Sequence, residues 1–463
     1  MRLPQYDEGS FRDPGGQVFA DQNHIYRTIN SSKAPIYKKC KEAGIYKWLE
    51  DRGYLVSLKE RDLSEFSDLG EEVKYVVEHP KLPFISYPYE WSFNPHKKAA
   101  LLHLDMHIDL LNKGFTLSDA SAYNIQFQGT KPIFIDHLSI EPYNDGDIWT
   151  GHQQFCAQFL NPLLLWSLAD IAPNSFFRGS LEGISPEETS KILPLSKKFS
   201  WTVFTHVVLQ AKLQKNALNN SIAEGKAKKT TLSKMSFIGI LTGMRNYIDK
   251  LKGPDTNTVW ASYENNNTYT DDDASQKLAF IQNMVQDVKP ALLFDIGCNT
   301  GNYSSASLDA GAANVIGFDF DHTTLDFAFE RFGKEGKNFT PLWLDAANPS
   351  PSQGWAQKER KGLTQRSNAD ALIALAFIHH IVIGRNIPLS MALDWLLEVA
   401  PCGVIEFPSK NDPMVKRLLN LRQDIFPDYT EKTFLRLLSE KSNVVASKHL
   451  NGGTRLLVWY KNS

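Results

Sequence analysis

The sequence predicts an α/β protein in which a seven-stranded, doubly wound sheet follows an α+β domain and a helical region. Three observations predict this. The chain has 463 residues, too many for one ordinary domain. Short apolar runs alternate with helical stretches after residue 274, which is typical of βαβ units. A glycine-containing turn near the end predicts a closing hairpin. We expect domains at 1–185, 186–255 and 256–463, with the polar tract 263–273 as the hinge into the last one.

Composition excludes several classes of protein. Hydrophobic residues make up 42% and charged residues 22%, so the chain should fold. Lys plus Arg is 50 against 52 Asp plus Glu, and a net charge of −2 argues against nucleic-acid binding. The four cysteines form no C-x-x-C pair, so the sequence shows neither a zinc motif nor a disulfide framework. This cysteine pattern favours a reducing, cytoplasmic setting. No leader and no apolar run of membrane-spanning length is evident, so we expect neither secretion nor a membrane span.

The first part of the chain predicts strands and helices in alternation. Two short apolar runs flank Asp21-Gln22-Asn23 and predict a hairpin, and two more flank Gly129 and predict a second one. Between them the apolar spacing predicts two helices and a strand. The expected elements are strands at 18–20, 25–29, 84–87, 124–127 and 132–135, and helices at 34–52 and 97–111.

The middle region, 186–252, has a helical pattern with a basic stretch. Such a charge run is usually the solvated face of a helix, and a partner-binding patch is the alternative. The stretch comprises Lys226, Lys228, Lys229 and Lys234.

The last region predicts five parallel strands followed by an antiparallel pair. Each expected strand is a short apolar run, and helical stretches separate the first five. The turn Asn451-Gly452-Gly453-Thr454 joins the last two. The expected strands are 291–296, 315–318, 342–344, 371–376, 404–407, 443–450 and 455–460.

A glycine loop follows the first of these strands, where open α/β sheets bind ligands. The loop, FDIGCNTGN over 294–302, has the pattern Gly297-x-x-x-Gly301 and contains Asn299. It lacks the middle glycine of the dinucleotide fingerprint and the Lys of a P-loop. The pattern therefore excludes a dinucleotide or a P-loop nucleotide and leaves a nucleoside without a phosphate chain.

Carboxylates at the strand ends suit a nucleoside. Asp319 ends the second strand, where a carboxylate accepts hydrogen bonds from ribose hydroxyls. Asp345 ends the third strand and is placed to meet the amino group of adenine. Asp295, just before the glycines, is expected either to orient the loop or to meet an ammonium group.

These residues resemble the first three signatures of class I S-adenosylmethionine-dependent methyltransferases, which have a Rossmann-like fold. The resemblance covers roughly residues 263–463. It implies S-adenosylmethionine as cofactor, with the loop of Gly297, Asn299 and Gly301 beside the methionine portion, Asp319 at the ribose and Asp345 at the adenine. The alternative is a doubly wound domain with ordinary turn glycines and strand-end carboxylates.

Four residues are candidates for acceptor chemistry. His379 and His380 follow the fourth strand, Glu406 ends the fifth, and Asp412 lies in the loop after it. A histidine has a suitable pKa to take a proton from a hydroxyl or amine acceptor. The alternatives are histidines that cap a strand or face solvent or a helix, a buried salt bridge for Glu406, and a helix cap for Asp412. These residues and the loop after Glu406 resemble a bacterial group that includes rhizobial nodulation-type methyltransferases.

A second constellation lies in the first domain. Asp119, Asn124 and Asp136 resemble the catalytic loop and metal-binding Asp of aminoglycoside-phosphotransferase and protein kinases. That kinase-like resemblance implies ATP, with Mg²⁺ held by Asn124 and Asp136. The sequence departs from it because no glycine-rich loop is present and Arg27 stands where the phosphate-binding Lys is expected. The alternative is that both aspartates are turn or cap residues.

Three functions follow as hypotheses. The first is a methyltransferase acting on an O or N acceptor, with the first domain recognising a small-molecule or glycan substrate. The second is a bifunctional kinase and methyltransferase that modifies a glycan or lipid-linked acceptor. The third is a non-catalytic binding or scaffold protein. The sequence leaves the identity of the acceptor and the oligomeric state open.

Overall fold

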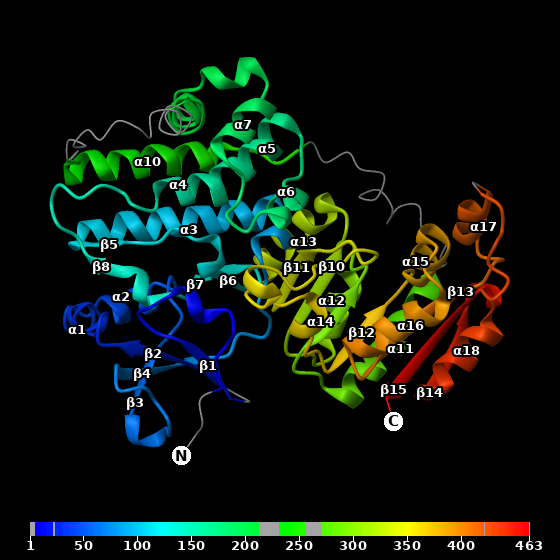
Figure 1. Ribbon diagram of the computed structural model, residues 1–463. Helices are drawn as coiled ribbons and strands as arrows, with labels where there is room; N and C mark the ends of the chain where they lie inside the picture. Colours follow the sequence, from blue (N-terminus) through cyan, green and yellow to red (C-terminus); the bar gives the residue numbers. More distant parts are fainter. Residues whose placement is uncertain (1–4, 22–23, 213–230, 255–270, 421, 463) are drawn as a thin grey trace.

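The computed structural model describes residues 5–21, 24–212, 231–254, 271–420 and 422–462 (Figure 1). The expected hinge over 263–270 and the lysines Lys226, Lys228 and Lys229 lie outside these residues. Among the described residues, no helix combines the length and the apolar character that crossing a membrane requires.

The chain begins with a four-stranded antiparallel sheet in the order β1-β2-β4-β3. The predicted first hairpin is confirmed, because Val18 pairs with Arg27. The single helix expected over 34–52 is instead two helices, because Gly44 interrupts it with a φ of +69°. The elements are β1 (Val18–Ala20), β2 (His24–Asn30), α1 (Ala34–Glu42), α2 (Ile45–Asp51), β3 (Lys59–Arg61) and β4 (Val73–Pro80).

A long buried helix, α3 (Phe93–Asn112), follows the small sheet. The second predicted hairpin, around Gly129, is confirmed as β6 (Ile125–Gln128) and β7 (Lys131–Phe134). A further pair, β5 (Phe115–Leu117) and β8 (Ile140–Pro142), brackets it. The segment that carries the kinase-like residues is thereby held between α3 and the small sheet.

The helices after residue 150 cover α3 (Figure 1). The last of them, α10 (Lys234–Lys250), packs along α3, where Arg245 Nε donates to Asp105 Oδ1 at 3.0 Å. The region expected as a linker, 186–255, is therefore in its described part a layer of the first domain's core. The other elements are α4 (His152–Phe155), the π-helical turn η6 (Cys156–Leu160), α5 (Asn161–Ala169), α6 (Asn174–Gly179), α7 (Pro186–Ile192), η7 (Leu195–Phe199), α8 (Trp201–Val203) and the π-helical turn η8 (Phe204–Leu209).

The C-terminal sheet has seven strands in the order β11-β10-β9-β12-β13-β15-β14. Its first five strands along the chain are parallel, and β15 pairs antiparallel with both β13 and β14, as predicted. The strands are β9 (Leu293–Ile296), β10 (Val315–Asp319), β11 (Phe339–Trp343), β12 (Ala371–Ala374), β13 (Cys402–Pro408), β14 (Ser442–Leu450) and β15 (Arg455–Asn462).

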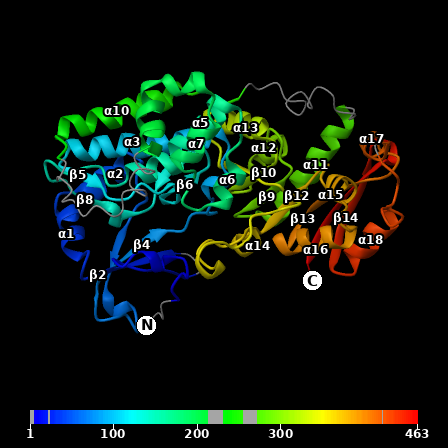
Figure 2. The same ribbon diagram turned by 45° about the horizontal axis from the view of Figure 1, so that its top comes forward.

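Helices lie on both faces of this sheet (Figures 1 and 2). Both faces of its parallel strands are thus buried, which explains why those strands read as continuous apolar runs. The helices are α11 (Asp271–Val288), α12 (Asn302–Asp309), α13 (His322–Glu335), α14 (Leu363–Arg366), α15 (Ile378–Arg385), α16 (Leu389–Val399), α17 (Pro413–Asn420) and α18 (Glu431–Ser439).

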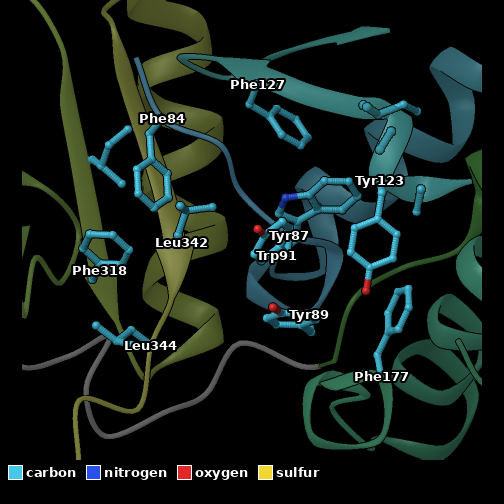
Figure 3. Packing of buried hydrophobic residues seen from close by; sticks show 14 of the residues in the cluster. Phe84, Tyr87, Tyr89, Trp91, Tyr123, Phe127, Phe177, Phe318, Leu342 and Leu344 are labelled. Atoms are coloured by element: carbon cyan, nitrogen blue, oxygen red, sulfur yellow. The ribbon is translucent and has the colours of Figure 1, made fainter. Parts of the chain in front are cut away.

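The prediction of a strand at 84–87 is wrong, because this segment runs from β4 to α3 without joining a sheet and packs against the C-terminal half. The side chain of Gln126 replaces a neighbouring strand, accepting from Ser86 N–H at 2.9 Å and donating to its carbonyl at 3.0 Å. Phe84 packs edge-on against Phe318 of β10, with ring centroids 6.0 Å apart (Figure 3). It also packs edge-on against Phe294 of β9, at 5.5 Å. We call residues 81–92 the connector.

Polar contacts also join the two halves. Arg366 of α14 forms a buried ion pair with Glu90 of the connector, and Ser350 donates to the same carboxylate at 3.1 Å. Asp326 of α13 accepts hydrogen bonds from Ser92 Oγ at 2.7 Å and from Asn94 N–H at 2.8 Å. In addition, one hydrophobic cluster extends from the small sheet to the seven-stranded sheet.

Candidate functional site

A cavity of about 490 Å³ lies at the carboxyl ends of β9, β10, β11 and β12. The loops after these strands form its wall, together with residues of α11, α12 and α15. Five predicted site residues line it: Gly297, Asn299, Asp319, Asp345 and His380. Four others do not: Asp295, Gly301, His379 and Glu406.

The glycine loop turns sharply because three of its residues have a positive φ. The values are +82° at Gly297, +49° at Asn299 and +83° at Gly301. A Cβ at Gly301 would lie 2.8 Å from Cε2 of Phe332, so this glycine allows the loop to approach α13. Gly297 is on the cavity wall itself. The two predicted glycines thus have different roles, one in packing and one in lining the cavity.

Asp319 joins the end of β10 to the glycine loop. Its Oδ2 accepts from Asn299 N–H at 2.8 Å and its Oδ1 from Asp321 N–H at 3.0 Å. Burial raises the pKa of Asp319 to about 6. Among the described residues it has no ion-pair partner. A bound ligand that donates hydrogen bonds would therefore stabilise the ionised carboxylate.

Asp345 reaches the cavity two residues beyond β11. Its Oδ1 accepts from Ala347 N–H at 3.1 Å, and its Oδ2 lies 3.6 Å from Nη2 of Arg385 on α15. Arg385 also lines the cavity and was not predicted. The two carboxylates of neighbouring strand ends therefore share one wall, as the sequence predicts.

Asp295 lies beneath the loop and is almost fully buried. Ser304 of α12 donates to its Oδ2 at 2.5 Å. Burial raises the pKa of Asp295 to about 7. Of the two expected roles, orienting the loop fits this position, whereas contact with a ligand's ammonium group does not.

The two histidines at the start of α15 differ in their access to the cavity. His380 lines it, and burial lowers the pKa of His380 to about 4, so its imidazole is neutral at pH 7. His379 is fully buried, and neither of its ring nitrogens has a hydrogen-bond partner among the described residues. The structure therefore places one candidate base at the site and the other beneath it.

Glu406 does not line the cavity, which corrects the expectation that it meets the acceptor. Its carboxylate is fully buried between Lys277 Nζ at 2.8 Å and Arg455 Nη1 at 3.3 Å. It also accepts from the N–H of Ala376, a cavity residue with a φ of +49°, at 2.6 Å. Glu406 thus positions the loop after β12. Asp412 completes the network through Arg455 Nε at 2.7 Å.

Sequence reasoning missed Lys277 of α11 and Tyr303 of α12, which also line the cavity. The Lys277 ammonium lies 5.0 Å from the centroid of the Tyr303 ring. A signal for Lys277 was present, because it is a cation on the helix face that continues through the buried residues Ile281, Met284 and Val285. Tyr303 gave no comparable signal.

A second cavity, of about 730 Å³, lies between the small sheet and α4 and contains the kinase-like residues. The structure brings all three together, as predicted. Asn124 Nδ2 lies 2.8 Å from Asp119 Oδ2 and 3.4 Å from Asp136 Oδ2. Glu359 and Arg360 of the C-terminal half also line this cavity, so both halves contribute to it.

Arg27 is one of the cationic side chains that line the second cavity. Its Nη1 lies 2.6 Å from Asp136 Oδ1, and its Nη2 contacts Asp13. Asp136 Oδ1 also accepts from Leu138 N–H at 3.2 Å, which caps a short helical turn. A guanidinium therefore holds the carboxylate that the resemblance assigns to Mg²⁺, and this arrangement does not fit the metal.

No family model matches the chain. The nodulation protein NoeA of Rhizobium meliloti (strain 1021) is 45% identical over 457 residues, which cover 98% of this chain and 96% of that protein. Among the solved structures that are similar over part of the chain are two methyltransferases. The N-methyltransferase NodS of Bradyrhizobium japonicum WM9 is 13% identical over 42% of this chain and 97% of its own, with a TM-score of 0.30. Magnesium protoporphyrin IX methyltransferase of Synechocystis PCC 6803, solved with bound SAH, is 14% identical over 54% and 95%, with a TM-score of 0.31.

Proposed function

The chain belongs to the family of the nodulation protein NoeA, and we propose that it is an S-adenosylmethionine-dependent methyltransferase that acts on an O or N acceptor. The observation that carries this proposal is the cavity at the strand ends, where the glycine loop, Asp319 and Asp345 form one wall. A cavity of about 490 Å³ falls within the usual range of small-molecule sites.

The residues on this wall fit the cofactor. Asp319 would accept hydrogen bonds from the ribose hydroxyls. Its raised pKa supports this role, because a ligand that donates hydrogen bonds would stabilise the ionised carboxylate. Asp345 would accept from the adenine amino group. The backbone at Gly297 and Asn299 leaves room for the methionine portion. When bound, the cofactor supplies an electrophilic methyl group on sulfur.

The acceptor end of the cavity is at α15. His380 is neutral at pH 7 and would take the proton that a hydroxyl or ammonium acceptor loses as it is methylated. His379 and Glu406 would hold this end of the cavity in place from beneath. His380 is therefore the candidate catalytic residue, and the other two are positioning residues.

We assign substrate recognition to the first domain. The second cavity is larger than the first and is lined by charged and hydroxyl-bearing side chains, which suits a polar acceptor such as a glycan. The hydrogen bonds that bring Asp119, Asn124 and Asp136 together favour the bifunctional alternative. The pairing of Arg27 with Asp136 is the observation against it.

Calorimetry with S-adenosylmethionine tests the proposal. We expect one site per chain, and Asp319→Ala should weaken binding by about 1.5 to 3 kcal/mol, because hydrogen bonds to a charged group are lost. Asp309→Ala, which removes a carboxylate exposed on α12, is the matched control and should bind normally. Binding of NAD without binding of S-adenosylmethionine would overturn the assignment.

Mass spectrometry identifies the acceptor. Cells with and without the gene are compared for methyl groups in the polysaccharide and small-molecule pools, with labelled methionine as the methyl source. We expect a labelled methyl group on oxygen or nitrogen of one compound that only the intact strain makes. Identical pools in both strains would favour the non-catalytic alternative.

A further inference from the structure

One cluster of metal-ligating side chains lies outside both cavities in the part of the chain that the structure describes. It consists of His152, Cys156 and His206, whose donor atoms all lie within 4.8 Å of one another. His152 begins α4, Cys156 begins the π-helical turn η6, and His206 lies in the π-helical turn η8, 54 positions after His152. Single π-helical turns occur frequently at functional sites.

The distances suit a tetrahedral ion. His152 Nε2 lies 2.8 Å from His206 Nδ1 and 3.7 Å from Cys156 Sγ. Zinc bonds of about 2.0–2.1 Å to nitrogen and about 2.3 Å to sulfur place tetrahedral ligands about 3.4 to 3.6 Å apart. The distance between His152 Nε2 and Cys156 Sγ already fits, His206 Nδ1 lies within 4.8 Å of that sulfur, and the two imidazole nitrogens would separate by about half an ångström.

Hydrogen bonding alone leaves this cluster incompletely satisfied. An imidazole nitrogen directs either one hydrogen or one lone pair in the plane of its ring. His152 Nε2 nevertheless faces both His206 and Cys156. His152 Nε2 can therefore form a hydrogen bond with only one of these two partners. A metal ion at the centre would instead bind His152 Nε2, His206 Nδ1 and Cys156 Sγ together.

The protonation states also suit a metal ion. Burial lowers the pKa of His152 and that of His206, the latter to about 4, so both imidazoles have free lone pairs at pH 7. Cys156 is almost fully buried, and this burial raises the pKa of its thiol. Ion binding would therefore release one proton, from the sulfur.

We propose that His152, Cys156 and His206 bind one zinc-class divalent ion, with water in the fourth position. One sulfur and two imidazole ligands suit Zn²⁺ and disfavour Mg²⁺ or Ca²⁺. As the Zn–S bond forms, the thiol proton passes to solvent, while the two histidines contribute lone pairs. The ion ties the outer segment 195–209, which carries the exposed Phe199 and Trp201, to the core helix α4. This inference does not depend on the proposed function.

Metal titration of the full-length, chelator-treated protein tests the proposal. We expect one Zn²⁺ per chain and one proton released per ion at pH 7. With Co²⁺ we expect a thiolate-to-cobalt charge-transfer band together with the d–d bands of a tetrahedral site. Cys156→Ser should remove the charge-transfer band and weaken Zn²⁺ binding at least about tenfold, since even second-shell changes cost 10- to 100-fold.

His206→Gln is the second variant, because His206 is only half-buried and its loss should leave the fold and its circular dichroism spectrum intact. It should weaken Zn²⁺ binding as Cys156→Ser does. Cys402→Ser, in the C-terminal sheet, and His449→Gln, an exposed histidine beside Glu431, are controls that should bind normally. Binding that all four variants retain equally, or an octahedral Co²⁺ spectrum, would overturn the proposal.

Discussion

One carboxylate in each cavity, Asp319 and Asp136, differs from the other in what balances its charge. In the C-terminal cavity, Asp319 is buried without an ion-pair partner among the described residues, and its pKa is raised to about 6. In the N-terminal cavity, Arg27 contacts both Asp136 and Asp13. A buried carboxylate without a cation is stabilised by a ligand that donates hydrogen bonds to it. A carboxylate already paired with arginine gains little from a metal. The same residue type therefore indicates a ligand contact at Asp319 and an internal ion pair at Asp136.

The largest effect is expected from Gly297→Arg. The residue has a φ of +82° and lines the C-terminal cavity, so the side chain would both strain the loop and fill the space. We expect calorimetry to show no S-adenosylmethionine binding. Gly311→Arg is the matched control, because Gly311 also has a positive φ but faces open space. Equal loss in both variants would attribute the effect to backbone strain and not to the cavity.

We expect substitutions of the two histidines to differ in their effect on kcat. His380→Asn should lower kcat by roughly 10² to 10⁴ with cofactor affinity nearly unchanged, because the acceptor's proton loses its base. His379→Asn should affect kcat much less, since His379 lies beneath the wall. Because the pKa of His380 is about 4, the rate should show no histidine inflection near pH 6.5. Near-normal rates in both variants would remove the histidines from the chemistry.

The pH dependence of cofactor binding tests the unpaired carboxylate directly. The pKa of Asp319 is higher in the folded, ligand-free protein than in the unfolded chain. Protonation of Asp319 therefore stabilises the ligand-free fold at low pH, and this contribution to stability is lost as the pH rises through about 6. Ribose hydroxyls favour the ionised form. Affinity should therefore fall about tenfold from pH 7 to pH 5. Asp319→Asn should abolish this dependence, and Asp295→Asn should retain it; a flat wild-type profile would contradict the assignment.

The smallest effect is expected from ATP with Mg²⁺. A ligand at about 100 times its Kd stabilises the folded state by roughly 2.7 kcal/mol. We expect no such thermal shift from ATP and Mg²⁺, because Arg27 holds Asp136, while S-adenosylmethionine in the same assay should produce one. A shift with ATP and Mg²⁺ that Asp136→Ala removes would make the two cavities alike and support the bifunctional alternative.

Local signals account for the parts of the fold that the sequence predicts correctly. The seven strands of the C-terminal sheet are apolar runs bounded by turns, and the glycine hairpin at 451–454 closes the sheet. Phe84 misled the strand prediction because its partners, Phe294 and Phe318, are more than two hundred residues away. The break at Gly44 was missed because the apolar spacing continues across it.

Contacts between residues far apart in the sequence also explain which site residues were predicted wrongly. Strand-end positions bring Asp319 and Asp345 to one wall, because the carboxyl ends of parallel strands meet there. The burial of Glu406 depends on Lys277 and Arg455, which lie on a distant helix and strand. No spacing rule in a single sequence pairs residues so far apart.

The connector has a consequence for the synthesis of the protein. Phe84 leaves the ribosome more than two hundred residues before β9 and β10, the strands that cover it. At about 5 to 20 residues per second, this delay is on the order of ten to fifty seconds. Throughout that interval Phe84 lacks the two aromatic rings against which it packs in the complete fold. This interface between the two halves therefore forms only after β9 and β10 have been synthesised.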